Sequence, residues 1–365
     1  MSGDDRRTLA KPRGDENHEN EEDEMNWHGK RVLVTGGCSF IGSHLVDALV
    51  ARGPAHLRVV DDLSTGRLAN IGGHVDEAIV EFRQGDLRDP VLCAEAARGM
   101  DVVFHLAAIH GGRGYIDLHQ ADCTANLVLD GNVVRAAVEA GVERLVFASS
   151  GCVYPVGLQT DPSRPLWLEE PMVGPPYDPD GTYGWAKLST ELTLAALYRD
   201  HGFSSSSCRL FTVYGERCLE SHAVIAMIGR AFLGQRPFEV WGDGTQVRNW
   251  TYVGDIVRGL VLAAERVSDG SAVNLGTEEP IRVIDAARMV LGLASLEAPI
   301  RLRPDMPTGP LSRVASNARA RELLGWTPEV AFAEGLARTL DWYFASRRAD
   351  RDRLAERFET LVLER

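Results

Sequence analysis

Three side chains of the sequence, Ser150, Tyr183 and Lys187, have the types needed to remove the proton of a hydroxyl group. Tyr183 and Lys187 are four residues apart, which places both side chains on one face of a helix. A phenol has a pKa of about 10 in water, and a neighbouring ammonium group lowers that pKa because it favours the phenolate. Ser150 can hydrogen-bond the same oxygen. Loss of the hydroxyl proton accompanies loss of hydride from carbon, so the set predicts oxidation of an alcohol.

The elements around these residues predict a site at the edge of a sheet. The apolar run Leu145–Ala148 is typical of a buried strand of a parallel sheet. Residues 149–155 are then expected to form the loop that leaves its carboxyl end, where open α/β sheets bind ligands. Ser150 and Cys152 lie on this loop, and a helical pattern runs from Tyr183 to Arg199. A free cysteine is often a small buried hydrophobic residue, but this position favours a role for Cys152 in the site.

A nucleotide-binding pattern stands near the start of the folded chain. The apolar strand 30–35 is followed by Gly36-Gly37-Cys38-Ser39-Phe40-Ile41-Gly42 and a helical pattern to about residue 52. Strand, tight turn and helix are the context of a dinucleotide fingerprint, and the helix N-terminus attracts the pyrophosphate. Asp61 ends the next strand, where a carboxylate accepts hydrogen bonds from ribose and repels a 2′-phosphate. The pattern predicts NAD rather than NADP, although a solvated acid in a turn would look the same.

Composition restricts the class of protein. The chain has 365 residues, a net charge of −13 and six scattered cysteines without the close pairs of a metal site. Such cysteines predict a reduced, cytoplasmic protein. The acidic charge argues against nucleic acid as a general partner. No apolar run approaches the roughly 20 residues of a membrane helix, and the polar N-terminus does not resemble a signal peptide, so we expect no membrane association.

The chain divides by pattern into four parts. Residues 1–26 are polar and acidic and are predicted to form a disordered tail. Alternating strands and helices over 27–215, with return segments near 250–275, predict a doubly wound parallel α/β sheet of the Rossmann type. Residues 216–347 are expected to form mainly a smaller α/β domain for the substrate, and 348–365 a C-terminal helix or tail.

Several local elements are also expected. Strands are predicted at 57–60, 78–82, 208–211 and 272–275, and a strand with its exit loop at 102–108. Helices are predicted at 121–140, 253–265 and 283–293, the second of these packed on the first domain. Residues 161–179 are expected to form a long loop, Ser204–Ser207 a turn, and 238–248 two short strands around Gly242-Asp243-Gly244. His105 is expected to be a packed core histidine.

These motifs resemble the extended short-chain dehydrogenase/reductase family, the NAD-dependent nucleotide-sugar epimerases and dehydratases, over roughly residues 30–347. Within it, the chain is most similar to the 3,5-epimerases that act on GDP-mannose. That narrower resemblance rests on Ala107–Ile116, Ala148–Pro155 and Trp241–Gly244. It implies NAD as cofactor, a nucleotide-diphosphate sugar, preferably GDP-mannose or a close GDP-sugar, as substrate, and a homodimer.

The resemblance assigns a role to each matching position. The catalytic positions are Ser150, Cys152, Tyr183, Lys187 and His222. The cofactor-binding positions are Gly36, Ser39, Phe40, Ile41, Gly42, Asp61, Asp86, Leu87, Ala107, Tyr183 and Lys187. The substrate-binding positions are Gly111, Gly112, Arg113, Thr212, Trp241, Arg248 and Arg313, and no metal is expected.

Departures from the family pattern shape the predicted reaction. Ser39 stands at the middle glycine of the fingerprint, and Thr212 stands where relatives have a substrate-binding asparagine. His222 stands at the lysine that forms an acid/base couple with the cysteine in 3,5-epimerases. Gly151 and Cys152 replace the Asp-Glu of dehydratases, which disfavours dehydration.

The predicted function is epimerisation at C3 and/or C5 through a transient 4-keto sugar. A nucleotide-sugar 4-epimerase of the UDP-glucose type, which needs only rotation of the keto sugar, is one alternative. A non-catalytic NAD-sensing protein is another, but a sensor has no need of the proton-transfer set Ser150, Tyr183 and Lys187.

Overall fold

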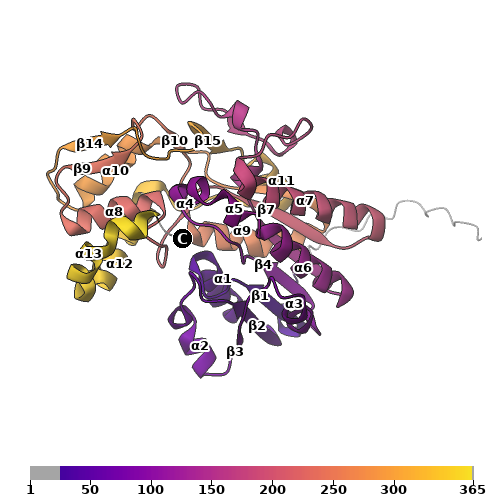
Figure 1. Ribbon diagram of the computed structural model, residues 1–365. Coiled ribbons are helices and arrows are strands. Elements are labelled where there is room, and N and C mark those ends of the chain that lie inside the picture. Colours follow the sequence, from indigo (N-terminus) through magenta and orange to yellow (C-terminus); the bar gives the residue numbers. More distant parts are fainter. Residues whose placement is uncertain (1–24, 364–365) are drawn as a thin grey trace, which may run out of the picture.

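The computed structural model describes residues 25–363 and is built around a seven-stranded parallel sheet (Figure 1). The strand order is β12-β7-β5-β4-β1-β2-β3. These strands are β1 (Arg31–Thr35), β2 (His56–Asp61), β3 (Val80–Gln84), β4 (Val102–His105), β5 (Arg144–Ser150), β7 (Ser205–Leu210) and β12 (Asp269–Leu275). Because β1 pairs with both β2 and β4, the order reverses there, as in doubly wound sheets. The predicted fold class is confirmed.

Helices cover both faces of the sheet because its strands are apolar on both sides. Along β1, Val32 and Val34 pack under α1 (Phe40–Val50), α9 (Val253–Arg266) and α11 (Ala318–Leu324), whereas Leu33 faces the opposite layer. That layer contains α3 (Pro90–Ala97), α6 (Asn126–Glu139) and α7 (Gly181–His201). Full burial of each such side chain contributes about 1.5–3 kcal/mol. The predicted packing of 253–265 on the first part of the chain is observed.

A smaller part lies beside the carboxyl edge of the sheet (Figure 1). Its strands form two groups, β13-β10-β15-β6 and β14-β9, and a short pair, β11-β8, connects it to the main sheet. The strands are β6 (Trp167–Leu168), β8 (Val213–Tyr214), β9 (Phe238–Trp241), β10 (Val247–Arg248), β11 (Thr251–Tyr252), β13 (Ile281–Arg282), β14 (Ile300–Arg303) and β15 (Ser312–Ala315). The helices are α8 (Ala223–Leu233), α10 (Val283–Leu293), α12 (Phe332–Arg347) and α13 (Arg351–Leu363).

Short helices complete the structure. They are α2 (Gly72–Asp76), α4 (Arg113–Leu118) and α5 (Gln120–Cys123), with the 3₁₀ turns η1 (Trp27–Gly29), η2 (Leu68–Asn70), η3 (Gly151–Val153), η4 (Val156–Leu158), η5 (Glu170–Met172) and η6 (Arg348–Asp350). The predicted acidic tail falls almost wholly on residues 1–24, outside the described residues. The domain boundaries stay a prediction. Between residues 25 and 363, no helix has the length and apolar character to cross a membrane.

Distant strand partners decide the structure of two segments, and one local prediction is wrong for that reason. Ser205–Ser207 do not form a turn; they lie fully buried in β7 between β5 and β12, where pairing on both sides outweighs the weak strand preference of serine. The segments around Gly242-Asp243-Gly244 do form two strands, but they do not pair with each other. Strand β9 pairs with β14, and β10 pairs with β13 and β15.

Three other elements differ from their predicted extent. The helix expected over 121–140 is broken between α5 and α6, where the buried Asn126 side chain bonds the backbone of Ile109 and Cys123. Within the loop expected over 161–179, β6 pairs with β15 and η5 follows it. The strand expected at 78–82 begins two residues later, after Ala78, which has φ +57°.

A close backbone contact joins the two parts of the molecule and can be tested. A Cβ added to Gly112 would lie 1.6 Å from the carbonyl oxygen of Ser221. Gly112→Ala should therefore force the loop before α4 away from Ser221 and lower the free energy of unfolding by about 1–3 kcal/mol. Gly292→Ala is the matched control, because a Cβ there meets nothing within 4 Å inside α10. We expect that control to be neutral or stabilising by about 0.5–1 kcal/mol in urea unfolding. Equal stability of the two variants would contradict the tight contact.

Candidate active site

Two adjoining cavities open at the carboxyl edge of the sheet. The first, of about 350 Å³, extends from the end of β5 to α8 and β9 of the smaller part. The second, of about 340 Å³, lies beside the ends of β2 and β3. Gly36, Ser39, Thr65 and Ala108 line both, so the two form one continuous depression.

The residues predicted from the sequence all line these cavities. The first cavity is lined by Ser150, Cys152, Tyr183, Lys187, His222, Gly111, Gly112, Arg113, Thr212, Trp241, Arg248 and Arg313, with Phe40, Ile41 and Gly42 of the nucleotide turn. The second cavity is lined by Asp61, Asp86, Leu87 and Ala107. The fold therefore brings the residues into one region, and their individual roles stay predictions.

The turn between β1 and α1 has the shape that a dinucleotide requires. Gly36 has φ +72°, and a Cβ on Gly42 would lie 2.1 Å from the carbonyl oxygen of Gly36. The helix therefore packs directly on the turn, a close approach that glycine permits. Ser39 makes no capping bond at the start of α1, which leaves N–H groups of the first turn available to a pyrophosphate. These features fit NAD.

Ser39, where the family has glycine, causes no backbone strain. Its φ of −82° and ψ of −177° are extended values that any residue adopts. Asp61 accepts hydrogen bonds from the N–H groups of Cys38 (2.9 Å) and Leu63 (2.8 Å). Burial raises the pKa of this carboxyl, and the two backbone bonds oppose that rise. Asp61 thereby supports the turn from the side facing the second cavity.

Tyr183 and Lys187 lie one turn apart on α7, next to Ser150 at the end of β5. Burial raises the pKa of Tyr183 well above its ordinary value, and a hydrogen bond from Ser150 works against that rise. Lys187 Nζ lies 5.9 Å from the Tyr183 ring centroid. Burial also lowers the pKa of Lys187. The expected lowering of the phenol pKa is therefore not found in this structure, where enclosure of the phenol raises it.

A buried polar network behind Lys187 escaped the sequence analysis. Asp130 Oδ2 of α6 lies 3.6 Å from Lys187 Nζ, and Asp130 Oδ1 lies 3.1 Å from His105 Nε2. Thr35 Oγ1 accepts the N–H of Leu106 and lies 2.8 Å from His105 Nδ1, so His105 directs an Nε2–H toward Asp130. His105 is fully buried, as expected of a core histidine. The signal in the sequence was an aspartate within an otherwise apolar helix pattern.

Charge explains how this network stays buried. Burial alone would raise the pKa of Asp130, but the charge of Lys187 and the bond from His105 lower it. Burial lowers the pKa of His105, so its imidazole is neutral. Asp130 is thus the counter-ion of Lys187.

Three arginines gather at the other end of the first cavity. Arg113 Nη1 and Arg313 Nη2 both donate to Asp180 Oδ2, at 2.6 and 2.9 Å, and Arg313 Nη1 donates to Cys152 Sγ at 3.2 Å. Enclosure and the neighbouring guanidinium groups of Arg313 and Arg113 lower the pKa of Arg248 to about 9. Positive charge therefore concentrates here despite the acidic chain, as an anionic ligand requires.

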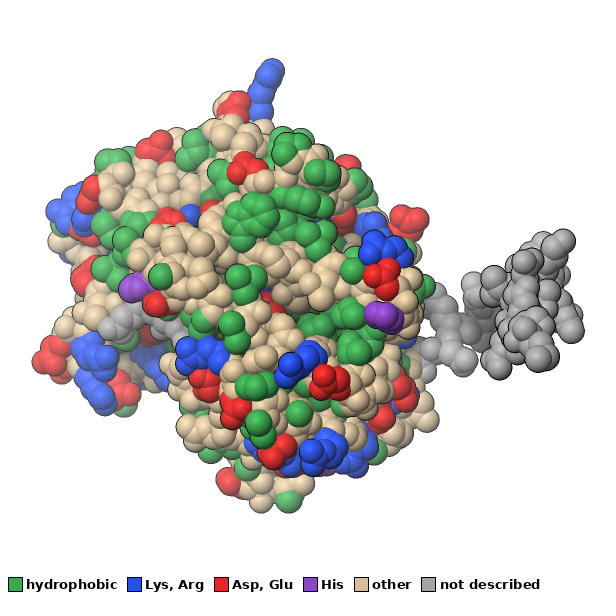
Figure 2. Space-filling model, turned by 45° about the vertical axis from the view of Figure 1, so that its right-hand side comes forward, with side chains coloured by type: hydrophobic (Ala, Val, Ile, Leu, Met, Phe, Trp, Pro, Cys, Tyr) green, Lys and Arg blue, Asp and Glu red, His purple; other side chains and the backbone are tan. Residues whose placement is uncertain are grey.

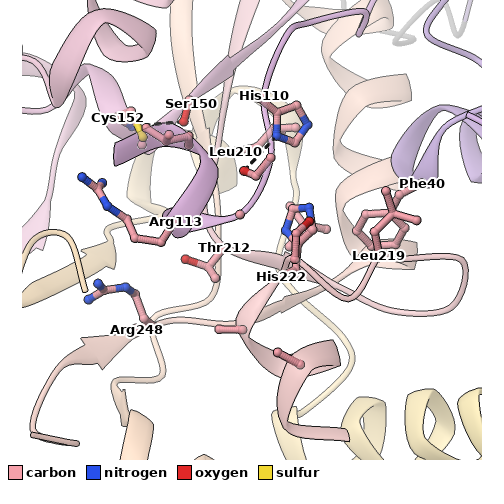
Figure 3. Close-up of a pocket in the computed structure, with 18 of the residues that line it drawn as sticks. Phe40, His110, Arg113, Ser150, Cys152, Leu210, Thr212, Leu219, His222 and Arg248 are labelled. Carbon is pink, nitrogen blue, oxygen red and sulfur yellow. Dashed lines mark hydrogen bonds between the residues drawn. The ribbon is translucent and has the colours of Figure 1, made fainter. Parts of the chain in front are cut away.

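Two histidines lie at the opposite side of the cavity (Figure 3). His222 precedes α8, and its enclosed position together with the charge of His110 lowers its pKa to about 3. Figure 3 shows Thr212 between this pair and the arginines. His110 was not among the predicted site residues, although it belongs to the segment 107–116 that carries the family resemblance. Among residues 25–363, no group of acidic, histidine and cysteine side chains is arranged to hold a metal ion.

Known proteins share this arrangement across most of the chain. Residues 32–276 match the model of the NAD dependent epimerase/dehydratase family. GDP-mannose 3,5-epimerase 1 of Oryza sativa subsp. japonica is 31% identical over 330 residues, which cover 88% of this chain and 84% of that protein. UDP-glucose 4-epimerase of Mycolicibacterium smegmatis is 33% identical over 319 residues, which cover 86% and 98%.

A solved structure agrees with these matches. The complex of Thermus thermophilus UDP-glucose 4-epimerase with NAD has a TM-score of 0.75 and 29% identity, over 86% of this chain and 98% of that one. Together with the nucleotide turn and the helix carrying Tyr183 and Lys187, the matches show that the chain belongs to the NAD-dependent epimerase/dehydratase family and uses NAD.

Proposed function

We propose that this enzyme epimerises a nucleotide-diphosphate sugar, GDP-mannose or a close GDP-sugar, at C3 and/or C5 through a transient 4-keto sugar. The observation that carries the proposal is the placement of Cys152 and His222. Both line the cavity that contains Tyr183, but Cys152 comes from η3 and His222 from the start of α8. Figure 3 shows them on different walls of that cavity.

The first stage is oxidation of the sugar at C4. NAD, when bound, supplies the hydride acceptor for this carbon. Tyr183 takes the hydroxyl proton, and Ser150 holds the phenol oxygen by a hydrogen bond. Because burial raises the pKa of Tyr183, its phenolate must be stabilised by positive charge near the filled site, and Lys187 lies one turn away on α7.

The second stage moves a proton on carbon. A ketone at C4 acidifies the hydrogens at C3 and C5, and inversion requires removal from one face and return on the other. The pKa of His222 is lowered to about 3, so its imidazole is neutral near pH 7 and acts as the base. Cys152, held by its bond from Arg313, donates from the other wall as the acid.

The arginines of the first cavity are proposed to bind the diphosphate of the substrate. Arg248 and Arg313 are proposed to contact the diphosphate, because guanidinium groups bind phosphate oxygens in pairs. Asp180 ties Arg313 to Arg113 and also donates its N–H to the carbonyl of Cys152 at 2.8 Å. The preference for a guanine base rests on the resemblance to GDP-mannose 3,5-epimerases.

A 4-epimerase is the second candidate. The match to the Mycolicibacterium smegmatis UDP-glucose 4-epimerase favours it, since that protein is covered over 98% of its length. A 4-epimerase would need Ser150, Tyr183 and Lys187 but no acid or base on carbon. The role of Cys152 therefore separates the two functions.

We also propose a homodimer located in the cytoplasm. Exposed apolar side chains occur on the two adjacent helices α6 and α7, including Leu127, Val128, Trp185 and Leu192. Figure 2 shows apolar side chains in patches between charged groups on the face displayed. A second copy would cover such a helix pair. The six cysteines are free and buried, which suits a reducing compartment.

The cofactor preference can be tested at Asp61. Its carboxylate should repel the 2′-phosphate of NADP, so NAD should bind more tightly in calorimetry. Asp61→Asn should reduce that preference about tenfold, or ~1.4 kcal/mol. Asp62→Asn is the control, because it removes the neighbouring charge in the same cavity. A preference unchanged by Asp61→Asn would remove this carboxylate from cofactor selection.

The oxidation stage can be tested at Tyr183. Tyr183→Phe removes one hydroxyl and should slow formation of the 4-keto sugar by about 10²–10⁴-fold, the range of a lost proton-transfer group. Tyr198→Phe on the same helix is the control, because Tyr198 is 41% exposed and lies outside both cavities. The keto sugar can be trapped by borohydride and measured by mass spectrometry. Wild-type rates in Tyr183→Phe would limit the Tyr183–Lys187 pair to a structural role.

The proposed function itself is tested at Cys152. Incubated with GDP-mannose in deuterated water, the wild-type enzyme should give deuterium at C3 or C5, seen by proton NMR. Cys152→Ala should still make the 4-keto sugar, but its rate of inversion at C3 or C5 should fall at least about 10²-fold. Cys93→Ala, which removes a buried thiol of α3 outside both cavities, is the control. Inversion of C3 or C5 by Cys152→Ala at the wild-type rate would contradict the proposal. Inversion of C4 without deuterium from the solvent would favour the 4-epimerase.

A further inference from the structure

The first cavity contains a second imidazole, His110, which lies between Tyr183 and His222. Its ring centroid lies 5.8 Å from that of His222 and 6.0 Å from that of Tyr183. The His110 and His222 rings are nearly perpendicular, with an interplanar angle of 77°. His110 comes from the segment between β4 and α4, and His222 from the start of α8, so the pair spans both parts of the molecule (Figure 3).

The two imidazoles are close enough to influence each other's protonation. Like charges in an enclosed cavity repel, so a proton on one ring disfavours a proton on the other. Besides enclosure, the charge of His110 is what lowers the pKa of His222. The other titratable or charged groups that line the cavity are Tyr183 and Lys187 of α7, Cys152 of η3, Glu239 of β9, and the arginines at 113, 230, 248 and 313.

The proposed inversion leaves a proton to be moved. His222 takes the proton from carbon, and the electron pair of that C–H bond passes to the C4 oxygen as an enolate. Cys152 then gives its proton to the opposite face, and the electron pair returns to carbon. After one inversion His222 holds one proton too many and the sulfur of Cys152 one too few. The proton on His222 must leave before the next turnover, and inside an enclosed cavity a neighbouring base gives it a route.

We infer that His110 is a further catalytic acid/base residue, which shares one proton with His222 and passes it to solvent after inversion. The inference rests on the proposed function. Transfer of the proton from His222 to His110 restores the neutral base, and the thiol of Cys152 regains its proton from water. The His110 ring also lies beside that of Tyr183, and both line the cavity in which the sugar is proposed to react.

The first arm of the test measures the pair without turnover. In histidine-labelled enzyme, long-range proton–nitrogen NMR follows the ring nitrogens of His222 between pH 3 and pH 9. With His110→Gln, the repelling partner is gone, so the titration of His222 should move to higher pH. His201→Gln, at the exposed end of α7, is the control and should leave the curve unchanged. An identical His222 curve in wild type and His110→Gln would overturn the shared proton.

The second arm measures catalysis with His110→Gln and His110→Asn. The measured quantity is the ratio of the rate of inversion at C3 or C5 to the rate of 4-keto sugar formation in the same sample. This ratio should fall at least about tenfold in both variants. His201→Gln should retain the wild-type ratio. Circular dichroism identifies any variant that fails to fold, and the other then decides. Deuterium in the wild type with an unchanged ratio in the His110 variants overturns this inference alone. Absence of deuterium in the wild type overturns the proposed function and this role together.

Discussion

A charged lysine stays inside a protein only beside a counter-charge, and the site of this enzyme depends on that constraint. Lys187 is 1% exposed, and Asp130 on the adjacent helix α6 provides the negative charge. The ion pair fixes how α7 lies against α6. Tyr183 is positioned with it, because it lies one turn before Lys187 on the same helix. His105 at the end of β4 holds Asp130 in turn, so the orientation of the phenol is connected to the sheet itself.

A second buried pair fixes the same helix one turn farther along. Glu191 accepts from Arg209 of β7 at 2.7 Å and from the hydroxyl of Ser149 at 2.5 Å. These bonds join α7 to β5 and β7, the strands whose ends carry Ser150 and Thr212 into the cavity. Helix α7 is therefore held in place by two buried ion pairs, one to α6 and one to the sheet, and not by apolar contacts alone. Small shifts of α7, which would misplace the phenol, require breaking one of these pairs.

What the sequence predicted depended on how far apart the interacting residues are. The nucleotide turn from Gly36 to Gly42 and the pair Tyr183–Lys187 are local, so spacing alone places them correctly. Ser150 was placed at a sheet edge by the apolar run before it, although the strand extends through Ser150 itself. These features needed no knowledge of partners elsewhere in the chain.

The misjudged features all depend on long-range contacts. Ser205–Ser207 form a strand because β5 and β12 lie on either side, and β9 finds its partner about 60 residues away in β14. Asp130 and His110 were not identified as site residues from the sequence. Asp130 gained meaning only when α6 packed on α7, and His110 only when the smaller part brought His222 beside it. Periodicity and short motifs do not describe such encounters, whose geometry the tertiary fold determines.

In the proposed reaction, His222 stands where the 3,5-epimerases that this chain resembles have a lysine, and the residue type decides what the position does. A lysine ammonium is protonated near neutrality and is suited to donate a proton, as an acid. His222, with a pKa lowered to about 3, is neutral at pH 7 and has a free ring nitrogen to accept one. Donation is then left to Cys152, which Arg313 holds in place on the opposite wall. In this proposal the exchange of residue type reverses the direction in which protons cross the sugar, and a base that must discharge its proton after each turnover accounts for the second imidazole beside it.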